Sequence, residues 1–172
     1  MEKKLDEHNI SDEELYVQKN VSYYLEVFFD IEKKGNKYKW NWASFFFGPL
    51  WCFYRKLYLI GIIAIVVYHL FEILAEVVTQ SLPIGIAMAV PVTLNAVIII
   101  IPAIAMGMLG NYFYKRSFDK HVMNKNSKDG TMHINYLSSK GGTNVGAVVL
   151  GVILLILYDA IQIYMRMQAT FS

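Results

Sequence analysis

Residues 57–78 read LYLIGIIAIVVYHLFEILAEVV, an apolar stretch in which Glu72 and Glu76 are the only formal charges. At ~1.5 Å per residue, a helix of this length crosses the ~30 Å hydrocarbon core of a bilayer. A second stretch, VGAVVLGVILLILYDAIQIYM, occupies residues 145–165 and carries only Asp159. A water-soluble fold could not keep both stretches dry, so the sequence predicts membrane-spanning helices.

The region between these two stretches contains a third candidate. Residues 82–109 are apolar, and no Lys or Arg occurs from Leu57 to Tyr114. We therefore expect an all-α, polytopic membrane protein with about three spans, at 57–78, 82–109 and 145–165. The middle span is longer than one straight crossing needs, and it contains Pro91 and Pro102. It is expected to be kinked, or to break near Pro91.

The distribution of charge predicts the orientation of the spans. The loop at 111–144 is predominantly basic, and basic loops stay on the cytoplasmic side of a membrane. The segment 1–39 is rich in Asp, Glu and Lys and lacks the apolar core of a signal peptide. We therefore expect a multi-pass protein of the cell membrane with a cytoplasmic N-terminus and a short outer tail at 166–172.

The N-terminal segment predicts one amphipathic helix over residues 12–34. Ser11 and Glu14 fit a capping box, and Gly35 is suited to end the helix. Apolar residues recur at helical spacing along one face: Val17, Val21, Tyr24, Phe28 and Ile31. This stripe either packs on the rest of the chain or on the membrane surface, or it docks a partner protein.

Residues 40–56 combine aromatic and basic side chains in a segment too short to span a bilayer. Basic residues flank both of its ends, and Gly48-Pro49 divides it. We expect an interfacial or shallow re-entrant elbow at the inner leaflet, with its aromatic and basic side chains at headgroup level. The expected anchors are Trp40, Trp42, Trp51, Tyr54, Arg55 and Lys56.

The elbow also carries a resemblance. Its residues WNWA at 40–43, FFFGP at 45–49, Trp51 and Tyr54-Arg55-Lys56 resemble the signature of a family of small bacterial integral membrane proteins known only as a domain of unknown function. Asn20, Tyr23-Tyr24 and Phe28 upstream, and Gly110-Asn111, Tyr112 and Tyr114 downstream, are similar to weaker parts of that pattern. The resemblance implies a location in the bacterial cytoplasmic membrane and supplies no activity.

Ionisable side chains inside spans are costly and are candidates for function. His69, Glu72 and Glu76 share one face of the first span, and Asp159 lies at a similar depth in the third. If these spans are neighbours, His69, Glu72 and Asp159 form a proton or cation site. Alternatively, the carboxyl groups only hydrogen-bond to neighbouring helices, or Glu76 only reaches the outer interface.

Several classes of function are not expected. The net charge of +2 does not indicate nucleic-acid binding, and Cys52 is the only cysteine. We find no catalytic, metal-binding or cofactor-binding motif, and the glycines at 141–142 lack the Lys and Ser/Thr of a phosphate-binding loop. Small residues one turn apart, such as Ala103 and Gly107 or Ala147 and Gly151, suggest close helix packing.

The expected function is that of a non-enzymatic scaffold, accessory or stress-response factor. Its partners would be the lipid bilayer and either further copies of the chain or another membrane protein. The alternative is a small transporter or channel component that uses the His69, Glu72 and Asp159 site. Because three spans are few for a complete pathway, that alternative implies oligomerisation.

Overall fold

A computed structural model describes residues 11–83, 90–123 and 130–171. Within these ranges, every regular element is a helix. In chain order these elements are α1 (Asp12–Val17), α2 (Val21–Lys34), α3 (Trp42–Tyr54), α4 (Tyr58–Gln80), α6 (Val90–Met123), α7 (Gly130–Lys140) and α8 (Val145–Phe171). The prediction of an all-helical chain is confirmed for the described residues.

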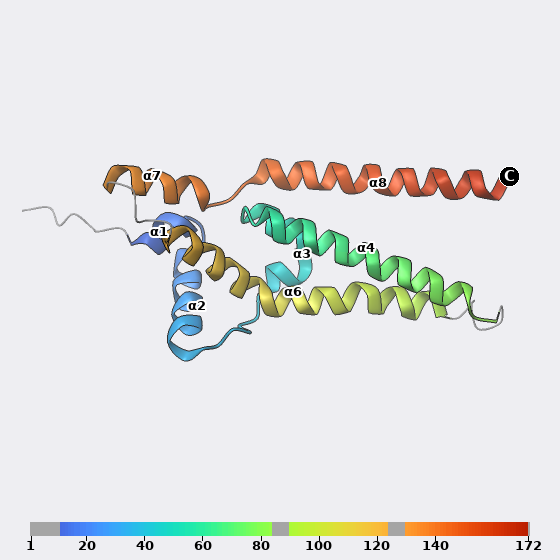
Figure 1. Cartoon of the computed structure of the whole chain (residues 1–172), viewed down its shortest axis with the longest axis horizontal. Coiled ribbons are helices and arrows are strands. Elements are labelled where there is room, and N and C mark those ends of the chain that lie inside the picture. Colours follow the sequence, from blue (N-terminus) through green and yellow to red (C-terminus); the bar gives the residue numbers. More distant parts are fainter. Residues whose placement is uncertain (1–10, 84–89, 124–129, 172) are drawn as a thin grey trace, which may run out of the picture.

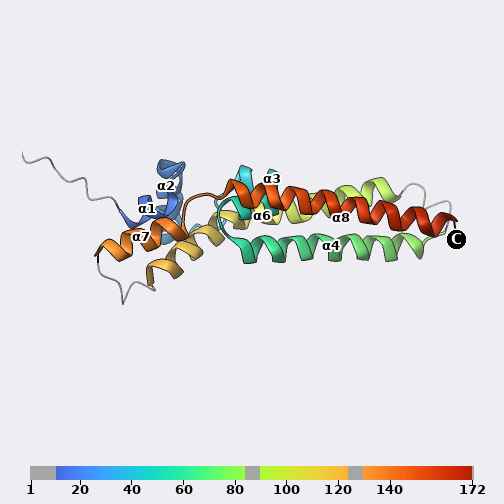
Figure 2. The same cartoon turned by 90° about the horizontal axis from the view of Figure 1, so that it is seen from above.

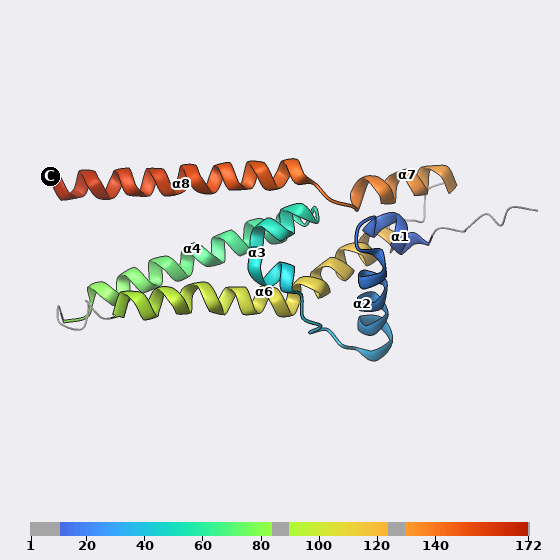
Figure 3. The ribbon, with the colours of Figure 1, turned by 180° about the vertical axis from the view of Figure 1, so that it is seen from behind.

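The helices form an elongated molecule with two unlike ends (Figures 1 and 2). Helix α4, the first part of α6 and α8 run along the long axis, and α3 lies among them. Helices α1, α2 and α7 gather around the last part of α6 at the opposite end, which Figure 3 shows from behind. We call α1, α2, α7 and residues 111–123 the head.

Two stretches are long and apolar enough to cross a membrane, by length and composition alone. One is α4, Tyr58–Gln80, and the other lies within Thr131–Met165, whose apolar part is α8. Most of their apolar side chains are exposed, for example those of Leu70 and Leu154. The predicted span at 82–109 includes residues 84–89, outside the described part, and remains a prediction.

The N-terminal helix differs from its prediction. The chain does not form one helix over 12–34, because α1 ends at Val17 and α2 begins at Val21. In the link between α1 and α2, Gln18 and Asn20 adopt positive φ angles of 58° and 57°. The Ser11–Glu14 capping box and the left-handed Gly35 at the end of α2 are both present as predicted.

The apolar stripe of this segment faces the interior of the protein. Val17, Tyr24 and Phe28 are buried in the main hydrophobic cluster, with Val21 and Ile31 packed against it. The stripe therefore packs on the rest of the chain, which was one of the two alternatives. It is not a free surface for docking a partner.

Helix α3 forms the elbow and bends where the sequence places Gly48-Pro49. Gly48 has φ 43° and ψ −116°, a conformation that glycine adopts without a Cβ clash. Pro49 begins the second half, where its missing N–H is tolerated. Asn41 caps the first half, because its Oδ1 accepts a hydrogen bond of 2.9 Å from the Ser44 backbone N–H.

The predicted loop at 111–144 is largely helical. Helix α6 continues past Leu109 to Met123, and α7 follows at Gly130–Lys140. Helix α6 extends because Tyr114 and Phe118 pack into the core of the head rather than into solvent. Helix α8 begins at Val145, as predicted, and ends at Phe171, so the predicted outer tail at 166–172 is mostly helical.

Candidate functional site

The elbow is fixed to α6 by hydrogen bonds to two backbone carbonyls, and two glycines of α6 permit the close approach. The Asn41 N–H donates to the Gly107 carbonyl at 2.8 Å, and Ser44 Oγ donates to the Met106 carbonyl at 2.9 Å. A Cβ on Gly107 would lie 2.9 Å from the Trp40 ring, and one on Gly110 would collide with the Ser44 side chain. The small residue at 107 therefore serves packing within the chain.

Gly151 has a similar role on α8. A Cβ at this position would lie 3.1 Å from the Phe53 ring and 3.2 Å from Leu50. Helix α8 thus packs on α3 through its small residue. The close packing predicted from the spaced small residues occurs at Gly107 and Gly151, and in both cases the neighbouring helix belongs to the same chain.

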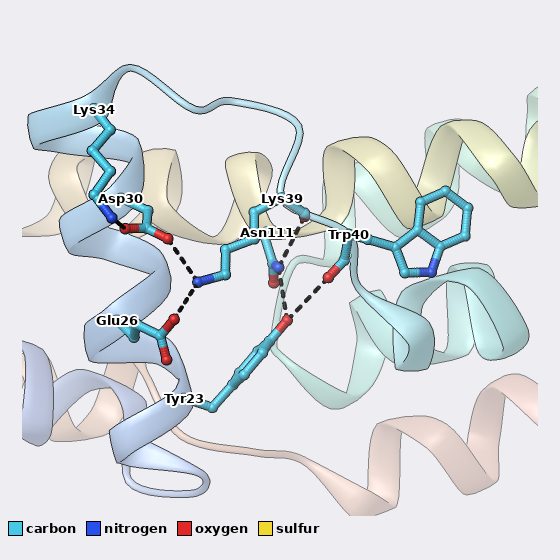
Figure 4. A network of polar contacts seen from close by, with 7 residues as sticks. All are labelled: Tyr23, Glu26, Asp30, Lys34, Lys39, Trp40 and Asn111. Atoms are coloured by element: carbon cyan, nitrogen blue, oxygen red, sulfur yellow. Dashed lines mark hydrogen bonds and ion pairs between the residues drawn. The ribbon is translucent and has the colours of Figure 1, made fainter.

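Asn111 joins three segments of the chain at the junction between the elbow and the head (Figure 4). This side chain is fully buried and accepts a hydrogen bond of 2.7 Å from Asn41 Nδ2. Its own Nδ2 donates to the Tyr23 hydroxyl at 2.9 Å and to the Lys39 carbonyl at 3.1 Å. Tyr23 in turn donates to the Trp40 carbonyl at 3.3 Å. A buried amide with this many partners fixes the position of the elbow.

Charged groups extend this network along α2 (Figure 4). Lys39 Nζ lies 2.8 Å from carboxylate oxygens of both Glu26 and Asp30, and Lys34 Nζ lies 2.7 Å from Asp30. The hydrogen bonds from Lys34 and Lys39 lower the pKa of Asp30. The bonds to Asp30 and Glu26 raise the pKa of Lys39. These charges hold the segment before the elbow against α2.

Arg55 is the most unusual residue of the junction, because it is an arginine only 2% exposed. Its Nη1 and Nη2 donate to the carbonyls of Val17, at 3.2 Å, and Lys19, at 3.1 Å. The break between α1 and α2 leaves these carbonyls without helical i→i+4 partners, and the Val17 carbonyl also accepts a hydrogen bond of 2.6 Å from the Lys19 N–H. The guanidinium carbon also lies 4.4 Å from the centre of the Tyr24 ring. Arg55 therefore stabilises the end of α1, where the helix dipole favours a cation.

An aromatic cluster surrounds this arginine. The rings of Tyr24 and Tyr114 lie 4.9 Å apart, and those of Phe28 and Phe118 stack at 5.3 Å. Burial raises the pKa of Tyr114 and of Tyr24, so both phenols stay neutral. Ring pairs at such distances add to the free energy of burial. The cluster and Arg55 together connect α1, α2, α3 and α6.

The expected membrane anchors fall into three groups: buried, exposed and half-buried. Trp51 and Arg55 are buried inside the protein, so they are not the exposed surface anchors that were predicted. Trp42 is 63% exposed and remains an expected anchor, whereas Trp40, Tyr54 and Lys56 are half-buried. Phe46, an elbow aromatic that was not named among the expected anchors, is 70% exposed. The four-residue spacing of Trp42 and Phe46 places both on one helical face, and this spacing could have predicted that Phe46 is exposed together with Trp42.

Helix α7 and the segment before α8 close the head against α1. His133 Nε2 lies 2.8 Å from Asp12 Oδ1, and the Gly142 N–H donates to the Tyr16 carbonyl at 2.6 Å. Gly142, with φ 75°, permits this approach. Asn144 caps α8, because its Oδ1 accepts a bond of 3.0 Å from the Ala147 N–H. Gly142 thus serves a backbone contact with Tyr16 of α1.

The structure brings together part of the predicted intramembrane site. His69 Nδ1 lies 2.9 Å from Glu72 Oε2, and the His69 ring lies 4.4 Å from the ring of Tyr158 on α8. Asp159 is exposed. Among residues 11–83, 90–123 and 130–171, no three His, Cys, Asp or Glu side chains lie close enough together to hold a metal ion.

The fold and junction define a small protein, helical throughout its described residues, in which a buried arginine of the elbow connects an aromatic head to long apolar helices. A family model described as a protein of unknown function, DUF2628, matches residues 16–119, and the chain belongs to that family. The match covers the end of α1, then α2, α3 and α4, and α6 as far as residue 119. No curated protein and no solved structure matches the chain.

Proposed function

We propose that the chain is a multi-pass protein of the bacterial cytoplasmic membrane with its head in the cytoplasm. The apolar surfaces of α4 and α8 support this proposal, since soluble monomers rarely expose contiguous apolar patches larger than a few hundred Å². The excess of basic residues over acidic ones in 111–144 favours a cytoplasmic head. The span at 82–109 would return the chain from the outer side.

A direct test of this topology is cysteine accessibility. With Cys52 replaced, a single cysteine at Lys33 on the head should be blocked by a membrane-impermeant maleimide only after the cells are opened. A cysteine at Gln80, at the far end of α4, should be blocked in intact cells. Labelling of both positions in intact cells, or of neither, would contradict the proposal.

Within the membrane, the protein acts as a non-enzymatic scaffold or accessory factor, with a role in stress response as one form of it. The observation that supports this best is Arg55, a buried cation that holds the head to the elbow. Such a junction gives the head a fixed position relative to the membrane. A fixed head presents its outer side chains, such as Phe29, to a partner.

This role can be tested by photocrosslinking in cells. A photoreactive side chain at Phe29, which is 55% exposed on the head, should form a discrete adduct with a second protein. The matched control is the same group at Ile156, which is exposed on α8 and should crosslink mainly to lipid. Absence of any discrete protein adduct at the head would contradict the scaffold role.

The second candidate function is a transporter or channel component. It is favoured by the His69–Glu72 hydrogen bond and by Tyr158, which brings α8 to the same depth. Three spans would have to oligomerise to enclose a pathway. Proteoliposomes should then show a cation- or pH-dependent flux that disappears in Glu72→Gln or Asp159→Asn. No flux for any tested ion would eliminate this candidate.

A further inference from the structure

A cavity of about 470 Å³ lies between α3, the start of α2 and the first turns of α8. Its apolar wall includes Phe47 and Leu50 of the elbow and Val148 and Val152 of α8. Tyr24 and Arg55 line it as well. Sites for small ligands commonly occupy about 300–1,000 Å³ and combine an apolar wall with a few polar groups. The cavity has the size and composition of such a site.

The cavity has a polar end and an apolar end. The Asn144 N–H donates to the Tyr54 carbonyl at 2.8 Å, which fixes the start of α8 beside Arg55. Helix α8 then runs away from the head (Figure 1). Val148 and Val152 therefore lie about 6 and 12 Å further along at 1.5 Å per residue. The wall changes from polar near the head to apolar along the apolar helices, which suits an amphiphile.

Arg55 brings a positive charge that the described residues do not neutralise. Within the described part of the chain, no carboxylate forms an ion pair with it, and its partners are two carbonyls and aromatic rings. Its Nε has no hydrogen-bond acceptor although the side chain is buried. A buried charge without a counter-charge is costly. An anionic group at the polar end of the cavity would reduce that cost.

We propose that this cavity binds one anionic phospholipid from the surrounding leaflet. An acyl chain occupies the wall formed by Phe47, Leu50, Val148 and Val152, and the phosphate lies at the Arg55 end. This inference rests on the membrane location proposed above. It adds a specific lipid site whose occupation would link the position of the head to the charge of the membrane.

The test is a lipid titration of the full-length chain in detergent, read by native mass spectrometry. The probes are phosphatidylglycerol and phosphatidylcholine with identical acyl chains, and glycerol phosphate as the free anion. We expect one tightly bound phosphatidylglycerol, at least tenfold preference over phosphatidylcholine, and no displacement by millimolar glycerol phosphate. Equal affinity for the two lipids, or displacement by the free anion, would overturn the proposal.

Two variants locate the site. Val152→Trp fills the cavity and should remove the bound lipid, whereas Ile153→Trp, at an exposed position that does not line it, should not. Arg55→Gln should reduce the preference for the anionic lipid to near unity. If Val152→Trp binds phosphatidylglycerol as tightly as Ile153→Trp does, the proposal is wrong. If the chain stays in the membrane fraction but binds no lipid selectively, the lipid-site proposal fails while the proposed membrane location stands.

Discussion

Replacing Arg55 with Met removes the charge and both guanidinium hydrogen bonds while keeping a long apolar side chain. The structure gives two bonds to backbone carbonyls, at 3.2 and 3.1 Å, and a ring contact at 4.4 Å. Bonds from charged donors contribute ~1.5–3 kcal/mol each, so the loss amounts to at most about 3–6 kcal/mol, because Met also removes the cost of burying an unpaired charge. Because Arg55 connects the elbow to the end of α1, this loss should fall on the docking of the head.

Hydrogen exchange measures that local effect directly. At about 1.4 kcal/mol per factor of ten, backbone amides of residues 12–34 should exchange faster in Arg55→Met, by up to roughly 10²–10⁴-fold. Amides of the α4 core should change little. The matched control is Arg116→Met, which removes an exposed arginine from α6 and should leave exchange unaffected. Equal protection of residues 12–34 in the two variants would refute the role assigned to Arg55.

Three further predictions concern the junction and the thiol. Gly110→Ala should lower the free energy of unfolding by ~1–3 kcal/mol, because its Cβ would collide with Ser44. Gly146→Ala, the control, should be nearly neutral. Equal losses for the two variants in denaturant titrations would contradict this prediction. The pKa of Asp30 is lowered, so its ion pairs stabilise the fold fully above pH 3.8, the unfolded-state pKa. This stabilisation is lost as the pH falls through the lower folded-state pKa. Asp30→Asn should therefore flatten that part of the stability–pH curve, and an unchanged curve would contradict the pairing. Burial raises the pKa of Cys52 to about 12, so maleimide should label it only after denaturation, and rapid labelling of the folded chain would show that the elbow opens.

The helices could be predicted where the local sequence contains their signals. The apolar stretches predicted α4 and the start of α8, and Ser11, Glu14 and Gly35 predicted the helix ends found there. The break after Val17 could not be predicted, since Gln18 and Lys19 are ordinary helix formers. Two carbonyls at this break accept hydrogen bonds from Arg55, which is 38 residues from Val17 in the chain. Contacts at that separation leave no local pattern.

The junction was predicted only in part. The sequence marked the elbow as a unit and singled out its aromatic and basic residues, yet it assigned all of them to the membrane surface. Composition cannot distinguish an arginine exposed at the membrane surface from one that is buried under Tyr24 and Tyr114, because both settings favour a cation beside aromatic rings. Likewise, the spacing placed His69 near Glu72, whereas Tyr158 became its neighbour only through the approach of α8.

The amino-acid sequence alone determines that this chain forms long apolar helices preceded by an aromatic elbow, because helix length, charge distribution and capping are properties of neighbouring residues. Only the tertiary structure decides which side chains of that elbow are buried. That outcome depends on the helix break, the small residues of α6 and the path of α8, which bring distant segments of the chain into contact.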